Sequence, residues 1–531
     1  MKLRLTVLAL AAGLSLAVAV AADAKTFRYA TGADLLGLDP HSNNEGPTNA
    51  MKGNLYEGLL HRRPDLSLNP SLATEWQQTA PDVWRFKLRQ GVKYHLGQDF
   101  TADDVVFSFA RQSQATSDMA YAVASIKEVR KIDSHTVELV TKGPDPVLLQ
   151  NLPLFYIMSK SWVEQNNAGT VERGAGKTNY PNVNANGTGP FRVVERVPDT
   201  RTVLEPNAVW WGNATRETNI TRAVFQPIGN AATRVAALLS GEMDLIYPLP
   251  LQDVDRIKAQ GGVQVMQGPE LRTIFLGFDQ WRDESLDMPG SKKNPFKDVR
   301  VRKAFYQAID INAIQRVVMR GASAPTASMV APGIQGFVED LNKRLPFDPD
   351  GAKKLLAEAG YPNGFPVTLD CPNDRYVNDE AICLAVVPMI KRIGIDIKLN
   401  AQTRSKHFNK ISLTEGNVTS FYLLGWTPGS YDSLNALMNL MTLSNRGAGH
   451  GEYNSGRYNN ARVNELTDLI KVEVDQVKRN AMIREAFKIH QDEVGHIPLH
   501  QQALAWGVRD SVAKAWQRPF DDVDLRFIVM K

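Results

Sequence analysis

Short strand-like and helix-like segments alternate along the chain from about residue 25 to its end. Residues 84–88, WRFKL, alternate apolar and charged side chains, which is typical of a half-buried strand. The stretch DPDGAKKLLAEAG predicts a helix that is capped by Asp348, has Pro349 in its first turn and ends at Gly360. This alternation indicates an α/β fold. No repeat of a short fixed period is visible, so a solenoid is not expected.

The chain has 531 residues, which is enough for several domains with hydrophobic cores of their own. Hydrophobic residues make up 43% and charged residues 22% of the sequence, so we do not expect a disordered chain. The net charge is +4, and the basic residues form no dense run. We therefore expect no nucleic-acid partner.

The first 24 residues have the pattern of a cleavable signal peptide. Two basic residues precede an apolar run over residues 5–20, and Ala22-Asp23-Ala24 follows it as a small-x-small cleavage site. A retained membrane anchor is the alternative, but the run is shorter than the ~20 residues of a spanning helix. No cysteine follows the site, so a lipid anchor is not expected. We predict a soluble protein exported to the periplasm.

The chain has two cysteines, Cys371 and Cys383, with a spacing of twelve. Export to an oxidising compartment permits a disulfide between them. Two buried free thiols are the alternative, and the sequence leaves the choice open.

Sequence patterns of catalysis are missing. There is no nucleophile elbow, phosphate loop or dinucleotide fingerprint. His490, His496 and His500 lie close together, but Gly495 and Pro498 interrupt any helix that could align them as metal ligands. We predict no catalytic residue, no metal site and no cofactor.

Several longer stretches carry a resemblance to a known family. In chain order they are LRQGVKYHLGQDFTADDVVFSF (88–109), GTGPFRVVE (187–195), AATRVAALLSGEMDLI (231–246), NPFKDVRVRKAFYQAIDINAI (294–314) and FDPDGAKKLLAEAGYPNGFPVTL (347–369). These blocks resemble family 5 of the extracytoplasmic solute-binding proteins, which serve dipeptide, oligopeptide and nickel ABC importers. The first block departs at Leu96, where the family often has an acidic residue.

The resemblance implies a bilobal, type II-like periplasmic-binding-protein fold with a subdomain inserted in lobe I. Its expected boundaries are 1–24 signal peptide, 25–60 lobe I, 61–179 inserted subdomain, 180–270 lobe I, 271–489 lobe II and 490–531 lobe I. The chain would thus cross between the lobes near 270 and 490, and a ligand would be enclosed between them.

The stretch CPNDRYVNDEAI (371–382) lies between a predicted strand and a predicted helix. In peptide-binding members of the family, this junction supplies a basic residue that meets the peptide carboxylate. Arg375 is the candidate, because a guanidinium can hold a carboxylate through two parallel hydrogen bonds. Tyr376 is a neighbouring ligand candidate. The alternative is a surface arginine paired with Asp374 or Asp379.

The stretch GWTPGSYDS (425–433) follows a buried strand. In the peptide binders, an aspartate three residues after the Trp pairs with the ligand ammonium, but this chain has Gly429 at that position. Asp432 is the nearest carboxylate and becomes the candidate, with Trp426 beside it. The alternative for Asp432 is a turn or the cap of a helix that begins at Ser433.

Two polar stretches resemble segments that line the ligand site in the family, 39–48 and 453–463. Asn43, Glu45 and Asn454 are the lining candidates there; solvated turns are the alternative.

Together these features predict the peptide-binding component of an ABC importer. Its partners would be a peptide, the inner-membrane permease subunits and their cytoplasmic ATPases, and the protein would be a monomer. The alternatives are another solute, such as a nickel chelate, haem, glutathione or an oligosaccharide, or a secreted hydrolase.

Overall fold

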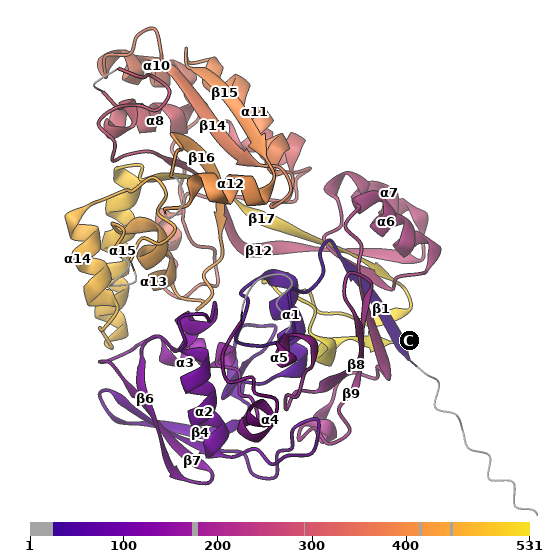
Figure 1. Ribbon diagram of the computed structural model, residues 1–531. Coiled ribbons are helices and arrows are strands. Elements are labelled where there is room, and N and C mark those ends of the chain that lie inside the picture. The colour runs from indigo at the N-terminus through magenta and orange to yellow at the C-terminus, as the bar shows by residue number, and fades with distance from the viewer. Residues whose placement is uncertain (1–24, 173–178, 291–292, 414–416, 446–449) are drawn as a thin grey trace, which may run out of the picture.

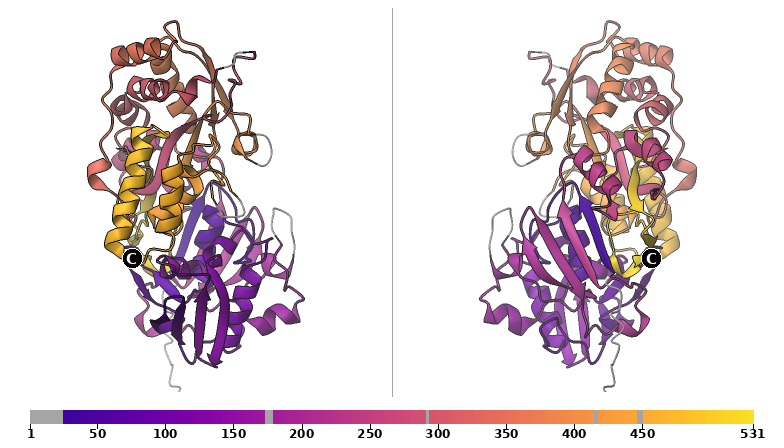
Figure 2. Two further views of the ribbon diagram at one scale, coloured as in Figure 1. Left: turned by 90° about the vertical axis from the view of Figure 1, so that its left-hand side faces the viewer. Right: turned by 90° about the vertical axis from the view of Figure 1, so that its right-hand side faces the viewer.

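A computed structural model describes residues 25–172, 179–290, 293–413, 417–445 and 450–531. The predicted signal peptide, 1–24, lies outside these residues. The described chain is α/β, as predicted, and folds into two lobes that are stacked one above the other in Figure 2. No helix in the described ranges is long and apolar enough to cross a membrane.

One large sheet runs through both lobes (Figure 1). Its eleven strands follow the order β15-β14-β16-β12-β17-β11-β1-β10-β9-β8, with β13 paired to β17. Their bounds are β15 Asp396–Gln402, β14 Pro366–Pro372, β16 Phe421–Trp426, β12 Val263–Phe278, β17 His496–Arg509, β11 Leu245–Ile246, β1 Thr26–Thr31, β10 Arg222–Pro227, β9 Arg201–Pro206, β8 Phe191–Val197 and β13 Ala324–Pro325. The strands β14 to β16 belong to lobe II, and β1 with β8 to β11 belong to lobe I.

The long strands β12 and β17 connect the lobes and cross the middle of Figure 1. Residues 263–269 of β12 pair with 503–509 of β17 in lobe I. Residues 273–277 pair with 496–501 in lobe II, after a register shift between Pro269 and Thr273. The chain therefore crosses at 270–272 and again near 502. The second crossing was predicted near 490, whereas β17 begins in lobe II at His496 and passes into lobe I within one continuous strand.

Lobe I is built from its half of the sheet and several helices. These are α1 Gly46–Leu55, α4 Lys160–Gln165, α5 Tyr180–Val183, α6 Ala231–Ser240 and α7 Val254–Gln260. Its core joins residues from both ends of the chain, because Phe27, Phe225, Trp506 and Leu525 belong to one buried cluster. The strands β18 Val512–Lys514 and β19 Val529–Met530 pair beside it.

A subdomain with a core of its own follows the first part of lobe I. Its sheet has the order β4-β5-β7-β6, formed by β4 Ala73–Ala80, β5 Val83–Leu88, β7 Thr136–Thr141 and β6 Ile126–Asp133. The hairpin β2 Leu60–Arg62 with β3 Leu68–Pro70 and the helices α2 Ala102–Gln112 and α3 Leu148–Asn151 complete it. Its buried cluster runs from Leu59 to Ile157. The amide of Thr101 donates to Asp104 and so caps α2 at its predicted start.

Lobe II contains its half of the sheet and two groups of helices. The helices are α8 Val299–Ala308, α9 Ile311–Ala313, α10 Pro349–Glu358, α11 Asp379–Lys391, α12 Arg404–Ile411, α13 Ser433–Ala436, α14 Ala461–Ile470 and α15 Gln476–Asp492. The predicted cap Asp348 accepts from the amide of Gly351 at 2.8 Å and starts α10. The helices α13 to α15 share a second buried cluster with the end of β16.

Candidate ligand-binding site

Charged and amide side chains occupy the point where β12 and β17 cross between the lobes. Glu270 is 2% exposed and accepts from Arg272 Nε at 3.0 Å and from Gln502 Nε2 at 2.6 Å. Gln502 Oε1 accepts in turn from the amide of Val377 at 3.1 Å, in the segment between β14 and α11. The crossing is thus hydrogen-bonded to the segment that holds Arg375.

Arg375 lies in this segment, at the carboxyl end of β14. Its amide and that of Tyr376 each donate to Asp379 Oδ2 at 2.9 Å, which fixes the backbone at the start of α11. The guanidinium is exposed and makes no hydrogen bond or ion pair with another residue in the described ranges. The predicted alternative, pairing with Asp374 or Asp379, is therefore not found, since Asp379 binds the amide and not the guanidinium.

The surroundings of Arg375 carry charges from both lobes. Although water reaches the guanidinium, enclosure by the protein lowers the pKa of Arg375, and the positive charge of Arg272 lowers it further. The carboxylates of Glu270 and of Glu45, in lobe I, act in the opposite direction and raise it. Glu45 caps α1 by accepting from the amide of Thr48 at 3.2 Å. Arg375 and Glu45 therefore face the same region from opposite lobes.

The C-terminal segment adds a further carboxylate, Asp521. Trp506 Nε1 donates to its Oδ1 at 2.8 Å, and the amide of Leu271 donates to the carbonyl of Pro519 at 3.0 Å. This second bond fixes the segment against the crossing. Burial, reinforced by the neighbouring charge of Glu270, raises the pKa of Asp521 to about 7. Its charge is therefore sensitive to anything that binds beside it. We name Glu45, Glu270, Arg272, Arg375, Gln502 and Asp521 the interlobe site.

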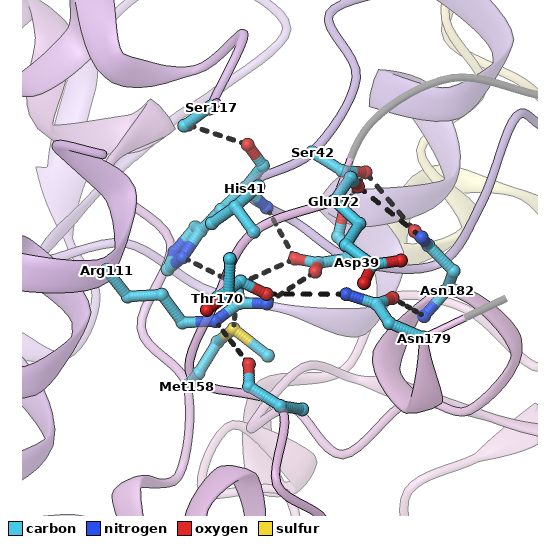
Figure 3. A network of polar contacts seen from close by, with 12 residues as sticks. Asp39, His41, Ser42, Arg111, Ser117, Met158, Thr170, Glu172, Asn179 and Asn182 are labelled. Carbon is cyan, nitrogen blue, oxygen red and sulfur yellow. Dashed lines mark hydrogen bonds and ion pairs between the residues drawn. The ribbon is translucent and has the colours of Figure 1, made fainter. Parts of the chain in front are cut away.

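The loop that carries Asn43 is fixed by a buried network (Figure 3). Arg111 of α2 holds Asp39 through two bonds of 2.9 and 2.6 Å, and both side chains are almost fully buried. Burial alone would raise the pKa of Asp39, but the bonds from Arg111 outweigh it and hold the pKa below its usual range. Burial and Arg111 lower the pKa of His41 to about 3, so its ring is uncharged.

Asn43 itself is 4% exposed, and its carbonyl accepts from the buried ammonium of Lys52. Its amide donates to Ser42 Oγ at 3.0 Å. The side chain is thus part of the network that supports the loop, whereas Glu45, half-buried on the same loop, acts on Arg375 through its charge.

The structure contradicts the prediction that Asp432 is open to a ligand ammonium. Asp432 is 0% exposed. Its two oxygens accept from Arg479 at 2.7 and 2.8 Å, and Oδ1 also accepts from the amide of Leu434 at 2.8 Å. Both oxygens are therefore engaged inside lobe II, and the residue caps α13, as the alternative interpretation proposed.

Tyr376 and Trp426 both lie near the end of β16. Tyr376 is buried, and its hydroxyl donates to the carbonyl of Gly425 at 3.3 Å. A Cβ on Gly425 would lie 2.8 Å from the Tyr376 ring, so glycine is required for this contact. Trp426 is half-buried; its Nε1 donates to Asn435 at 2.9 Å, and its ring packs on Tyr453 at 4.9 Å.

Asn454 does not reach the interlobe site. It is 0% exposed, and its amide nitrogen donates to the carbonyls of Thr442 and Tyr458 at 2.8 Å each. Its oxygen accepts from the amide of Tyr458 at 3.0 Å. Every polar atom of this side chain is used inside a turn of lobe II, which contradicts its prediction as a lining residue.

Sequence patterns did not point to four residues of the interlobe site, Glu270, Arg272, Gln502 and Asp521. One signal was present: in GPELRTIFLGF, two opposite charges interrupt an otherwise apolar strand, where they need partners or a function. For Asp521 the chain offered only a polar run near its end. The described residues include no group of three or more His, Cys, Asp and Glu side chains that could hold a metal ion.

Two α/β lobes joined by two strands, with charged residues at the crossing, define a bilobal binding protein. The chain belongs to the bacterial extracellular solute-binding proteins, family 5, whose sequence model matches residues 67–448. This confirms the family predicted from the sequence blocks.

Relatives of known function are similar over most of their length. Heme-binding protein A of Haemophilus influenzae is 29% identical over 497 residues, which cover 89% of this chain and 86% of the relative. The dipeptide-binding protein of Escherichia coli is 28% identical over 462 residues, or 81% and 82% of the two chains.

Solved structures confirm the bilobal fold. The periplasmic binding protein DppA of Helicobacter pylori, in complex with the peptide STSA, has a TM-score of 0.78 at 24% identity, covering 95% of this chain and 98% of that one. The dipeptide-binding protein of Pseudoalteromonas sp. SM9913, in complex with Met-Leu, has a TM-score of 0.79 at 21% identity, covering 96% and 100%.

Proposed function

We propose that this protein captures short peptides in the periplasm and delivers them to an ABC importer. The observation that carries the proposal is the exposed guanidinium of Arg375, on which the carboxylates of Glu270 and Glu45 act, with the carboxyl of Asp521 near Glu270. A free peptide has one negative and one positive end. A site with separated charges of both signs is complementary to such a ligand.

In this proposal Arg375 receives the peptide carboxylate. Its planar guanidinium offers two parallel donors, and among the described residues it has no hydrogen-bond or ion-pair partner with which a ligand would compete. Tyr376 and Trp426 form the wall beside it and contact the ligand backbone or its first side chain.

Asp521, with Glu270 beside it, receives the peptide ammonium. Asp432 cannot do so, because Arg479 already holds both of its oxygens. Glu270 is itself neutralised by Arg272, so Asp521 is the carboxylate whose charge gains most from an incoming cation. Glu45 adds negative charge from lobe I.

Binding would draw the lobes together, because the ligand contacts lobe II through Arg375 and the crossing and lobe I through Asp521 and Glu45. The closed form would then dock on permease subunits in the inner membrane, which cytoplasmic ATPases drive. The names of two relatives, a dipeptide-binding and an oligopeptide-binding protein, support the solute class. The protein would act as a monomer without a cofactor and would carry out no reaction.

Isothermal calorimetry with one tripeptide in three forms tests the proposal: free, N-acetylated and C-amidated. Arg375→Ala should weaken the free peptide by roughly thirtyfold to several thousandfold, since lost charge pairs of this kind cost about 2–5 kcal/mol. It should change the affinity of the amidated peptide far less. Arg375→Lys, which keeps the charge but not the paired donors, should give an intermediate loss.

Haem and glutathione belong in the same panel, because relatives of this chain carry those names. Tight binding of either, with no binding of the free peptide, would contradict the peptide proposal. Turnover of the peptide during incubation would contradict the assignment as a receptor.

A further inference from the structure

Tyr431 belongs to lobe II, but its side chain lies against two residues of the lobe I side. Its ring stacks on Phe520 of the C-terminal segment, with centroids 4.8 Å apart and an interplanar angle of 26°. The guanidinium of Arg62, in β2, lies over the same ring with Cζ 3.9 Å from its centroid. Tyr431 is 9% exposed, so these contacts bury it almost completely. We name Arg62, Tyr431 and Phe520 the interlobe clasp.

Tyr431 is presented by a firmly held turn. Its φ is +56°, its amide donates to Pro428 at 3.1 Å, and its carbonyl accepts from the amide of Gln335 at 2.9 Å. The next residue, Asp432, is fixed by the buried pair with Arg479. The carboxylate therefore has a structural purpose beyond capping α13, because it holds the turn that projects the tyrosine.

The two partners of Tyr431 are fixed as well. Arg62 is 5% exposed and donates to the carbonyl of Leu66 at 2.9 Å and to the side chain of Gln150 at 2.8 Å. Phe520 follows Pro519, whose carbonyl accepts from the crossing strand at 3.0 Å. The clasp thus joins preformed surfaces, and little ordering is needed when the lobes meet.

We propose that the clasp holds lobe II against the lobe I side and sets the fraction of molecules whose lobes are close enough to bind ligand. Stacking and cation–π contacts favour the joined arrangement. The apparent affinity of any ligand scales with the fraction of binding-competent molecules. The clasp would therefore act equally on every ligand, whatever its end groups, and this goes beyond the proposed function.

Two measurements on Tyr431→Ala test the clasp. In small-angle X-ray scattering, the ligand-free variant should have a larger radius of gyration than the parent protein. In calorimetry, its affinities for the free, N-acetylated and C-amidated tripeptide should all fall by one common factor, about tenfold for the loss of both contacts. Tyr431→Phe keeps the ring contacts and loses only the hydrogen bond between the hydroxyl and Arg518, so it should change both quantities less than Tyr431→Ala does.

Trp281→Ala is a matched control, because Trp281 has Arg457 over its ring at 4.1 Å but both residues lie in lobe II. It should change neither quantity. Phe520→Ala removes the stacking partner from the other side and decides the question if Tyr431→Ala does not fold, as judged by circular dichroism.

Unchanged scattering and affinities in Tyr431→Ala or, where that variant fails, in Phe520→Ala would overturn the clasp. A loss confined to one form of the peptide would also overturn it, since it would make Tyr431 a direct ligand contact. If the parent protein binds no peptide at all, the proposed function fails, while the scattering comparison still tests the clasp.

Discussion

At the scale of single residues, Asp432 does not have the ligand role expected for it, whereas Asp521, for which the sequence suggested no role, lies at the crossing. Asp432 follows Gly-Trp in the loop where a ligand carboxylate is expected, but Arg479 lies 47 residues further along the chain and returns on α15 to pair with it. Asp521 stands in an unremarked polar run, and the fold brings it to the crossing strands. Neither placement follows from local pattern, because each depends on a contact between distant segments.

Asp432→Asn should destabilise the protein without changing its choice of ligand. The substitution leaves the guanidinium of Arg479 buried without a counter-ion, which typically costs about 3–5 kcal/mol. Urea unfolding should register this loss as a lower midpoint. Asp340→Asn is the control. It breaks an exposed ion pair with Arg484, which lies on α15 as Arg479 does, and it should change the midpoint little. A selective loss of free-amino over N-acetylated peptides in Asp432→Asn would return Asp432 to the ligand site.

Asp521 should make peptide affinity depend on pH. Its pKa is about 7, so the carboxyl is mostly uncharged at pH 6 and mostly charged at pH 8. The peptide ammonium requires the charged form, and binding at pH 6 must therefore release a proton. Below pH 7 the affinity should fall, approaching tenfold per pH unit.

Calorimetry in two buffers of different ionisation enthalpy measures this proton release. Besides Glu270 and the hydrogen bond from Trp506, the groups that act on Asp521 are Arg272, Asp522 and Tyr247. Asp521→Asn should abolish the proton release and most of the slope between pH 8 and 6. A parent protein with no proton release at pH 6 would exclude Asp521 as the ammonium partner.

At the scale of helices and strands, capping residues and the alternation of apolar and charged side chains predicted the elements that local bonds determine. The capped helix predicted from Asp348 is α10, and the strand predicted at 84–88 is β5. Cys371 and Cys383 form a disulfide between β14 and α11, so one of the two open alternatives is realised. It ties the ends of the segment that presents Arg375.

Local rules did not locate the second crossing between the lobes. The strand β17 is buried along almost its whole length, in lobe II and in lobe I alike, so burial does not mark the change of lobe. Only its pairing with β12, and the register shift after Pro269, mark the change of lobe. The charged residues 270 and 272 lie within this register shift, where β12 has no partner residues in β17, and local sequence patterns do not locate such a shift.

At the scale of the whole molecule, the inserted subdomain has a buried cluster of its own, whereas one large cluster contains residues of both lobes, which two strands and the clasp also join. A ligand that contacts both lobes adds a connection that exists only in the folded protein. Peptide at a hundredfold excess over its Kd should therefore stabilise the fold by roughly 2.7 kcal/mol.

Differential scanning calorimetry should record this as a higher melting temperature with di- and tripeptides and no change with free sugars. Arg375→Ala offers the sharpest comparison, because among the described residues its exposed guanidinium has no hydrogen-bond or ion-pair partner to lose. The variant should melt at the temperature of the parent protein without ligand, and it should lose most of the shift at the same peptide concentration. Equal shifts from sugars, with none from peptides, would identify an oligosaccharide receptor. If peptides raise the melting temperature of Arg375→Ala as much as that of the parent protein, peptide remains the solute. Its carboxylate would then bind elsewhere at the crossing, where Arg272 is the next guanidinium.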